Sequence, residues 1–175
     1  MPDFSIETNL EHPVIGLDEV GRGPLAGPVV SCGCYFKNYK IQNEFNDYIG
    51  DSKKLSEKKR NLSFKFLQSL KKNNTIEYYL GIANVEEIDQ LNILEATKLS
   101  MKRVVDKFNM ENAYLLIDGN FSLNYKSYRE QSVIKGDDKS LSIAAASIIA
   151  KVHRDRLMKK LSLKFKDFGW EKNAG

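Results

Sequence analysis

The sequence predicts a mixed-sheet α/β domain. Near the start of its 175 residues, a strand, a turn rich in glycine and proline, and a second strand follow one another, which favours an antiparallel pair. Further along, helical and strand patterns alternate. One sheet that combines antiparallel and parallel neighbours and is flanked by helices accounts for both observations.

Two strands open the predicted sheet. Residues 14–18 form a short apolar run that ends in two carboxylates, those of Asp18 and Glu19. Residues 29–36 form the second strand. The segment between them holds three glycines and two prolines, the residue types of tight turns, so the two strands are expected to be antiparallel neighbours.

A helix and a third strand come next. Ser56 is a suitable helix cap, and the helix is expected to run to about Leu70. Residues 76–82 alternate between apolar and other side chains and are expected to form a strand. A second helix is expected over residues 92–108, because five apolar residues recur there at helical spacing: Leu94, Met101, Val104, Val105 and Phe108.

Two further strands and a long helix complete the prediction. Residues 113–117 are a continuous apolar run, typical of a strand buried on both faces, and they lead into Asp118. Residues 132–135 are expected to be the fifth strand. The helix is expected from Ser140 to about Phe165, and its small residues suit close packing on a sheet: Ala144, Ala145, Ala146 and Ala150.

Composition indicates one ordinary globular domain. The chain is 42% hydrophobic and 29% charged, and its length allows one core but is short for two. Its first residues show neither the basic nor the apolar region of a secretory signal, and no apolar run approaches the ~20 residues that span a bilayer, so we expect a cytoplasmic protein with no secretory signal and no membrane partner. Cys32 and Cys34 share one strand face and are expected to be buried thiols, neither a disulfide nor a zinc site.

Charge gives a weak indication of an anionic partner. The net charge is +4 and the isoelectric point is about 8.9. Two basic runs could each be a solvated helix face, but their position on either side of a possible carboxylate site favours contacts with phosphate. The two runs are Lys53, Lys54, Lys58, Lys59 and Arg60, and Lys151, Arg154, Arg156, Lys159 and Lys160.

Several familiar catalytic arrangements do not fit the sequence. The only histidines are His12 and His153, and a Ser-His-Asp triad would need one of them in a buried, oriented place, whereas His153 is expected to be exposed on a basic helix. The glycines of residues 21–27 lack the lysine of a P-loop and the spacing of a dinucleotide-binding loop.

Carboxylates at strand ends are the remaining candidates. Asp18, Glu19 and Asp118 follow apolar runs, and strand ends are where α/β sheets bind ligands. Each could be only a turn residue or a helix cap, and adjacent Asp and Glu point to opposite faces unless the strand twists or bulges. Oxygen-only ligands suit Mg²⁺ or Mn²⁺, and two such ions about 4 Å apart can promote phosphodiester hydrolysis. The residues alone therefore indicate a metal-dependent phosphotransfer enzyme.

At these residues the sequence resembles ribonuclease HII, the bacterial type 2 ribonuclease H. The most specific blocks are DEVGRG, from Asp18, and AAASIIAKV, from Ala144. Together the matching segments extend from near the start of the chain to near its end, in family order: residues 16–30, 51–55, 116–119, 135–137, 142–152 and 154–156.

The resemblance implies a ribonuclease H-like α/β fold, a five-stranded mixed sheet flanked by helices, in a single domain over residues 1–175. It also implies a monomeric endonuclease that uses Mn²⁺ or Mg²⁺. Its substrates would be RNA–DNA hybrids and duplex DNA with embedded ribonucleotides, which it would incise 5′ to the ribonucleotide to leave 3′-hydroxyl and 5′-phosphate ends.

The resemblance also assigns four metal-binding, catalytic carboxylates. They are Asp18, Glu19, Asp118 and Asp137. Asp138 and Asp155 are the rivals for the fourth position. Asp138 is expected to face the other way, and Asp155, in a helix rich in Arg and Lys, is more simply explained as a salt-bridge partner.

Substrate contacts follow from the same resemblance. Residues 21–23, Gly21-Arg22-Gly23, match the segment that lines the ribose 2′-hydroxyl and the adjacent phosphate, where glycine lets the backbone come close to a sugar. Lys53 is expected to contact backbone phosphate, with a solvated lysine as the alternative, and Ser147 is expected to bind substrate.

One departure from the family is the C-terminal end. The family continues past Gly175 with a tyrosine that stacks at the RNA–DNA junction, a glycine and a further helix. These 175 residues are therefore expected to keep the metal site but to cut single embedded ribonucleotides poorly, and a longer natural chain is expected. The alternative from another class is a non-catalytic nucleic-acid-binding domain, which loss of a metal-site carboxylate would have indicated.

Overall fold

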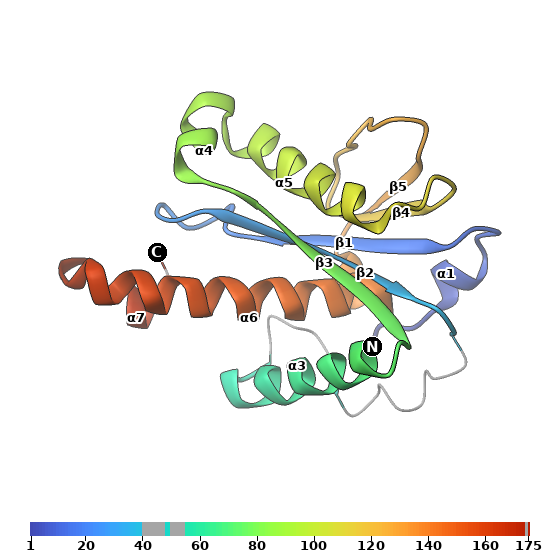
Figure 1. The fold of residues 1–175 in the computed structure, drawn as a ribbon, viewed down its shortest axis with the longest axis horizontal. Coiled ribbons are helices and arrows are strands. Elements are labelled where there is room, and N and C mark those ends of the chain that lie inside the picture. Colours follow the sequence, from blue (N-terminus) through green and yellow to red (C-terminus); the bar gives the residue numbers. More distant parts are fainter. Residues whose placement is uncertain (40–47, 50–54, 174) are drawn as a thin grey trace.

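The computed structural model describes residues 1–39, 48–49, 55–173 and 175 (Figure 1). Its centre is a five-stranded sheet in the order β3-β2-β1-β4-β5. β1 is antiparallel to β2, and β2 to β3, whereas β1 is parallel to β4 and β4 to β5. The predicted mixed sheet is confirmed. The strands are β1 (Val14–Val20), β2 (Val29–Phe36), β3 (Ile76–Ala83), β4 (Tyr114–Asp118) and β5 (Arg129–Val133).

Helices cover both faces of the sheet (Figure 1). One face packs against α3 (Glu57–Lys72) and the long helix α6 (Leu141–Lys164), and the other packs against α5 (Ile93–Phe108). Among the described residues, no helix has the length and apolar character needed to cross a bilayer. The shorter helices are α1 (Ser5–Thr8), α4 (Val85–Leu91), α7 (Trp170–Asn173) and the 3₁₀ turns η1 (Gly136–Asp138) and η2 (Lys166–Phe168).

The predicted helix starts agree with the observed caps. The Ser56 side chain accepts a hydrogen bond from the Lys59 N–H, 3.3 Å away, and so caps α3 as expected. Asn92, at a φ of 72°, ends α4 and caps α5 by accepting from the N–H groups of Leu94 and Glu95. α4 was not predicted, although Asn84 and Glu87 form a capping box at its start and Val85, Ile88 and Leu91 recur at helical spacing.

The fifth strand was predicted wrongly in its position. The expected range was residues 132–135, whereas β5 is Arg129–Val133. β5 is an edge strand with mostly exposed polar side chains, so it has no apolar alternation to mark its start. It ends at Val133 because Lys135 adopts a left-handed φ of 53° and Gly136 begins a 3₁₀ turn.

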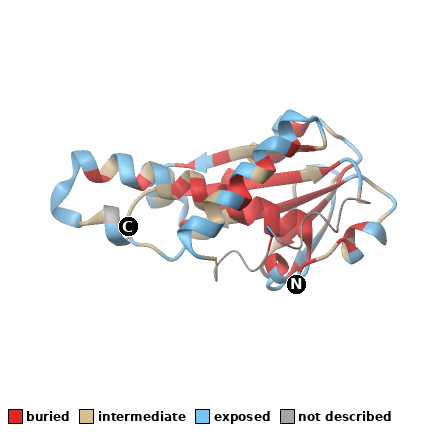
Figure 2. Cartoon of the chain, turned by 90° about the horizontal axis from the view of Figure 1, so that it is seen from below, coloured by how far each residue is buried: buried red, intermediate tan, exposed pale blue. Residues whose placement is uncertain are grey.

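Close packing of α6 on β1 confirms the prediction made from its alanines. An added Cβ at Gly16 of β1 would lie 2.4 Å from the backbone carbonyl carbon of Ser142, so only glycine lets the helix come this near. The first half of α6 is buried against the sheet and its last turns are exposed (Figure 2). Both cysteines are buried free thiols on the same side, as predicted.

The outer edge of β3 is covered by cationic side chains. The carbonyl oxygens of Tyr78, Leu80 and Ile82 alternate along this edge strand. They accept hydrogen bonds from Lys71 of α3 at 2.7 Å and from Lys107 and Arg103 of α5 at 2.6 and 2.7 Å. Carbonyls that lack a neighbouring strand are thereby satisfied by side chains.

Replacing Gly16 by Ala should destabilise the protein by roughly 1–3 kcal/mol, because the added methyl group overlaps the backbone of α6. Urea unfolding followed by circular dichroism measures this. Gly23→Ala is the matched control, since a Cβ at Gly23 meets no atom within 4 Å. Equal stability of the two variants would show that α6 can shift to make room.

Candidate active site

Two of the predicted carboxylates lie side by side because their strands are parallel neighbours. β1 and β4 pair in register from Val14–Tyr114 to Leu17–Ile117, so Asp18 and Asp118 are the next residues along each strand. Leu17 and Ile117 are buried on the α5 side. Because successive side chains alternate, Asp18 and Asp118 are directed to the α6 side of the sheet.

These carboxylates line an open pocket of about 500 Å³ that several elements build together. Glu19 also lines the pocket. This was not expected from strand geometry alone, because successive side chains of a strand point to opposite faces of the sheet. The lining combines acidic groups, the glycine-rich loop and basic side chains of α3 and α6. The pocket is lined by Asp18, Glu19, Val20, Gly21, Arg22, Gly23, Pro24, Arg60, Asp118, Ser147, Lys151, Arg154 and Asn173.

Asp18 is the most buried of the three pocket carboxyl groups, with 3% of its surface exposed. Burial, and then the neighbouring charges of Glu19 and Asp118, raise its pKa well above the ordinary value of 3.8. Hydrogen bonds from the Ser147 hydroxyl and from the Glu19 N–H, 2.7 Å away, act in the opposite direction. An ionised Asp18 is therefore poorly compensated by the protein alone.

The glycine-rich loop brings a cation to the acidic groups. Arg22 Nη1 lies 3.3 Å from Glu19 Oε1, and its guanidinium lies over the Phe121 ring at 5.4 Å. The sequence predicted Gly21, Arg22 and Gly23 as a substrate-binding segment, and all three line the pocket. That contact with substrate stays a prediction.

Asp137 stands next to this pocket without lining it. The Gly136 N–H donates to Asp118 Oδ1 at 2.6 Å, which joins η1 to the end of β4. Asp137 is 2% exposed, whereas Asp138 is exposed to solvent, so the two differ in the direction expected. Lys53 lies outside the described residues.

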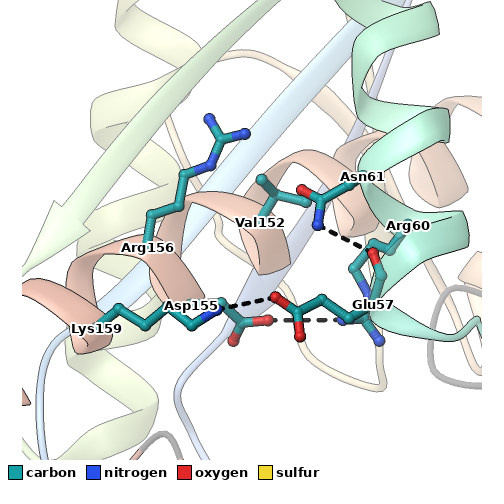
Figure 3. A pocket seen from close by; sticks show the side chains of 7 residues that line it. All are labelled: Glu57, Arg60, Asn61, Val152, Asp155, Arg156 and Lys159. Carbon is teal, nitrogen blue, oxygen red and sulfur yellow. Dashed lines mark hydrogen bonds and ion pairs between the residues drawn. The ribbon is translucent and has the colours of Figure 1, made fainter. Parts of the chain in front are cut away.

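Asp155 forms one ion pair within α6 and another with α3, as its sequence context predicted. It accepts from Lys151 Nζ at 2.7 Å and lies 3.6 Å from Arg60 Nη1 of α3. In the narrow crevice beside it, Lys159 pairs with Glu57 at 3.0 Å (Figure 3). The crevice is therefore a charged seam between α3 and α6.

The two basic runs were identified in the sequence, but the sequence did not show which of their residues line the pocket and which are buried. Arg60, Lys151 and Arg154 all line the pocket, but Arg154 is also buried and donates a hydrogen bond to the glycine-rich loop. The prediction for His153 was wrong. The imidazole is half-buried, edge-on to the Phe64 ring at 5.4 Å, and burial followed by nearby Arg156 and Lys71 lowers its pKa.

The profile of the ribonuclease HII family matches residues 15–175. The chain belongs to this family. A ribonuclease HII of Wolbachia pipientis from Culex pipiens is 47% identical over 99% of the chain and 84% of its own length. The chain is accordingly an enzyme, a metal-dependent ribonuclease H.

Solved structures of the family share the fold. Ribonuclease HII from Archaeoglobus fulgidus, solved in a complex with PCNA, is 27% identical with a TM-score of 0.73, over 90% of this chain and 80% of that one. Ribonuclease H2 from Pyrococcus horikoshii is also 27% identical, with a TM-score of 0.72 over 89% of this chain and 78% of its own. The predicted ribonuclease H-like fold is confirmed.

The donor set of the pocket fits a hard divalent cation in its chemistry. Three carboxylates supply only oxygen ligands, and a cation would offset the repulsion that raises the pKa of Asp18. As they stand, no three acidic, histidine or cysteine side chains in the described part of the chain are grouped to hold an ion. Glu19 faces Arg22 and Asp118 accepts from Gly136, so ion binding requires these side chains to turn towards a shared centre.

Asp18→Asn should stabilise the metal-free protein at pH 7, because it removes a buried, repelled charge. A raised pKa in the folded state means that stability is lost as the pH rises above the ordinary value of 3.8, so the advantage of the variant should shrink towards pH 4. Thermal unfolding in a chelator between pH 4 and pH 8 measures this. A wild-type protein that melts higher than the variant at pH 7 would contradict it.

In the presence of divalent cations the wild type should be more stable than Asp18→Asn. An ion at about 100 times its Kd stabilises the folded state by roughly 2.7 kcal/mol, so millimolar Mn²⁺ or Mg²⁺ should raise the unfolding temperature of the wild type by several degrees. Asp18→Asn and Asp118→Asn should respond much less. The same unfolding temperature for the wild type in chelator and in Mn²⁺ would count against an ion site here.

Proposed function

We propose that this enzyme is an endonuclease that hydrolyses RNA in RNA–DNA hybrids and incises duplex DNA on the 5′ side of single ribonucleotides. The observation that carries the proposal is one pocket in which Asp18, Glu19 and Asp118 face the Gly21–Gly23 segment. Acidic groups suited to cations and a backbone suited to a ribose are thus a short distance apart, as cleavage beside a ribonucleotide requires.

The reaction adds water across a phosphorus–O3′ bond. The water oxygen joins phosphorus, the O3′ leaves and takes up a proton, and the products have 3′-hydroxyl and 5′-phosphate ends. We propose that Asp18, Glu19, Asp118 and Asp137 hold two Mg²⁺ or Mn²⁺ ions, which supply the activation of water and the charge stabilisation. Asp137 would approach from the η1 side, where Gly136 already contacts Asp118.

The remaining pocket residues have separate roles. The Ser147 hydroxyl orients the Asp18 carboxylate through their hydrogen bond. Arg60 and Lys151 present positive charge from α3 and α6, and their pairing with Asp155 holds both side chains at the pocket wall, where they can contact substrate phosphates. Phosphate contacts of this kind give affinity and register, while recognition of the ribose gives selectivity.

Gly23 is the residue best suited to lie against the substrate sugar. A Cβ there would meet no atom within 4 Å, and its φ is not in the left-handed range, so neither packing nor backbone conformation requires glycine. The requirement would instead come from a ligand that approaches this point of the pocket. Gly21 differs, because its φ of 119° requires glycine for the fold itself.

The test is a cleavage assay on an RNA–DNA hybrid and on duplex DNA with one ribonucleotide, in Mg²⁺, Mn²⁺ or chelator. Cleavage should need the cation, and Asp118→Asn should lower it on the order of 100-fold or more. Asparagine keeps an oxygen that can accept from the Gly136 N–H, so the fold should be preserved. Binding of both substrates without any cleavage would favour the non-catalytic alternative.

Gly23→Ala should leave the unfolding temperature within about 2 °C of the wild type, because its methyl group points into open space. It should lower kcat/KM for the ribonucleotide-containing duplex by about 10-fold or more, since 1.4 kcal/mol of steric conflict with the sugar has that effect. Gly21→Ala, which should lose stability first, is the contrasting variant. Unchanged kcat/KM in a folded Gly23→Ala protein would remove Gly23 from the substrate contact.

A further inference from the structure

Arg154 is a buried cation whose hydrogen bonds run to the loop between β1 and β2. It is 1% exposed and is the largest fully buried side chain in the described part of the chain. Its Nε donates to the Pro28 carbonyl at 3.0 Å, and its Nη2 donates to the Ala26 carbonyl at 2.8 Å. One guanidinium of α6 thus holds two points of a loop that is more than 120 residues away in sequence.

The loop is shaped to lie on this side chain. A Cβ at Gly21 would come within 2.7 Å of Arg154 Nε, and one at Gly27 would come within 2.6 Å of Met158 Sδ. Both glycines have left-handed φ angles, 119° and 84°. The first and last glycines of the loop therefore combine a backbone turn with direct contact to α6.

A single stripe of α6 serves both the loop and the carboxylates. Ser147, Lys151, Arg154 and Met158 are spaced by four, three and four residues, which places them on one face of the helix. Ser147 bonds Asp18, Lys151 lines the pocket, and the next two contact the loop. One face of α6 thus contacts both the acidic groups and the loop that carries Arg22 and Gly23, and so fixes their relative positions.

We propose that Arg154 is a positioning residue that sets the place of Arg22 and Gly23 relative to the carboxylates, and so acts in substrate recognition without touching substrate. The proposal rests on the proposed function for the role of the loop. The pairing of β1 with β2 ends at Val20 opposite Val30. The two hydrogen bonds from Arg154, which we call the clamp, therefore act on the loop beyond the paired strands. Arg154 also lines the inner wall of the pocket, but it is 1% exposed, and its Nε and Nη2 donate to loop carbonyls.

Arginine suits this task better than other residues. Its planar guanidinium presents several N–H groups in a fixed fork and is less strongly hydrated than an ammonium group, so it can be buried against two carbonyls at once. Lysine would reach one carbonyl and would bury a more strongly hydrated charge. Glutamine would keep the two N–H groups of a single nitrogen, on a shorter side chain, and lose the charge. Either change leaves at least one loop carbonyl without its present donor.

The experiment compares Arg154→Gln with Arg103→Gln. Arg103 also donates to a backbone carbonyl, that of Ile82, and pairs with Glu87, but it lies on α5 on the other face of the sheet. Hydrogen exchange read by mass spectrometry, the unfolding temperature, the Mn²⁺-induced rise in that temperature, and kcat and KM on the ribonucleotide-containing duplex are measured for both. If Arg154 contributed only to stability, its substitution would change the unfolding temperature and none of the other quantities.

For Arg154→Gln we expect amides of residues 21–28 to exchange at least about 10-fold faster, with peptides of β1 and α5 unchanged. KM should rise by about 10-fold, since a loosened loop must be ordered on binding, while kcat changes by less than about 3-fold. The Mn²⁺-induced rise should be kept. Arg103→Gln should lower the unfolding temperature without altering exchange of the loop or KM.

Two results would overturn the proposal. Loop exchange equal to that of the wild type would show that Arg154 does not hold the loop, whatever the enzyme cuts. Faster loop exchange with unchanged KM would show that the loop position does not govern recognition. Failure of the proposed function is distinct, because it would appear as absence of cleavage by the wild type. If Arg154→Gln melts below the assay temperature, Arg154→Lys replaces it, with the same changes expected.

Discussion

The contact between α6 and β1 is the constraint on which the site depends. At Gly16 the helix backbone approaches the strand so closely that no side chain fits between them. Two residues further along the same strand face, Asp18 meets Ser147, which is five residues further along the helix. A change in the distance or angle of α6 would alter the hydrogen bond to Asp18, the position of Lys151 and the clamp on the glycine-rich loop together.

The acidic charges of the pocket repel one another, which favours cation binding and lowers the stability of the metal-free protein. Asp18, Glu19 and Asp118 gather where strand ends converge, and the raised pKa of Asp18 reflects burial and the two neighbouring charges. Of the surrounding cations, Arg22 pairs with Glu19, while three others have partners outside the acidic cluster. Arg60 and Lys151 are paired with Asp155, and Arg154 is turned to the loop. Positive charge of Arg60 and Lys151 is thus present in the pocket lining without cancelling the acidic charge at Asp18.

Much of the fold could be predicted from local pattern, and some of the site could not. The antiparallel β1–β2 pair and the buried β4 have clear turn and apolar signals, and parallel pairing then accounts for the meeting of Asp18 with Asp118. β5 lacks such a signal because it is a polar edge strand. Arg154 in a basic helical run has no feature in sequence that distinguishes a buried arginine from a solvated one. Its burial depends on a loop that only the tertiary fold brings to it.

The cationic cover along β3 has a consequence for contacts between molecules. An exposed sheet edge offers a row of carbonyl and N–H groups that a strand from another chain can join. Here Lys71, Lys107 and Arg103 occupy three alternate carbonyls, so an incoming strand would have to displace all three and bring its own backbone against their charges. The antiparallel edge of the sheet is thereby protected from pairing with the sheet of a neighbouring copy.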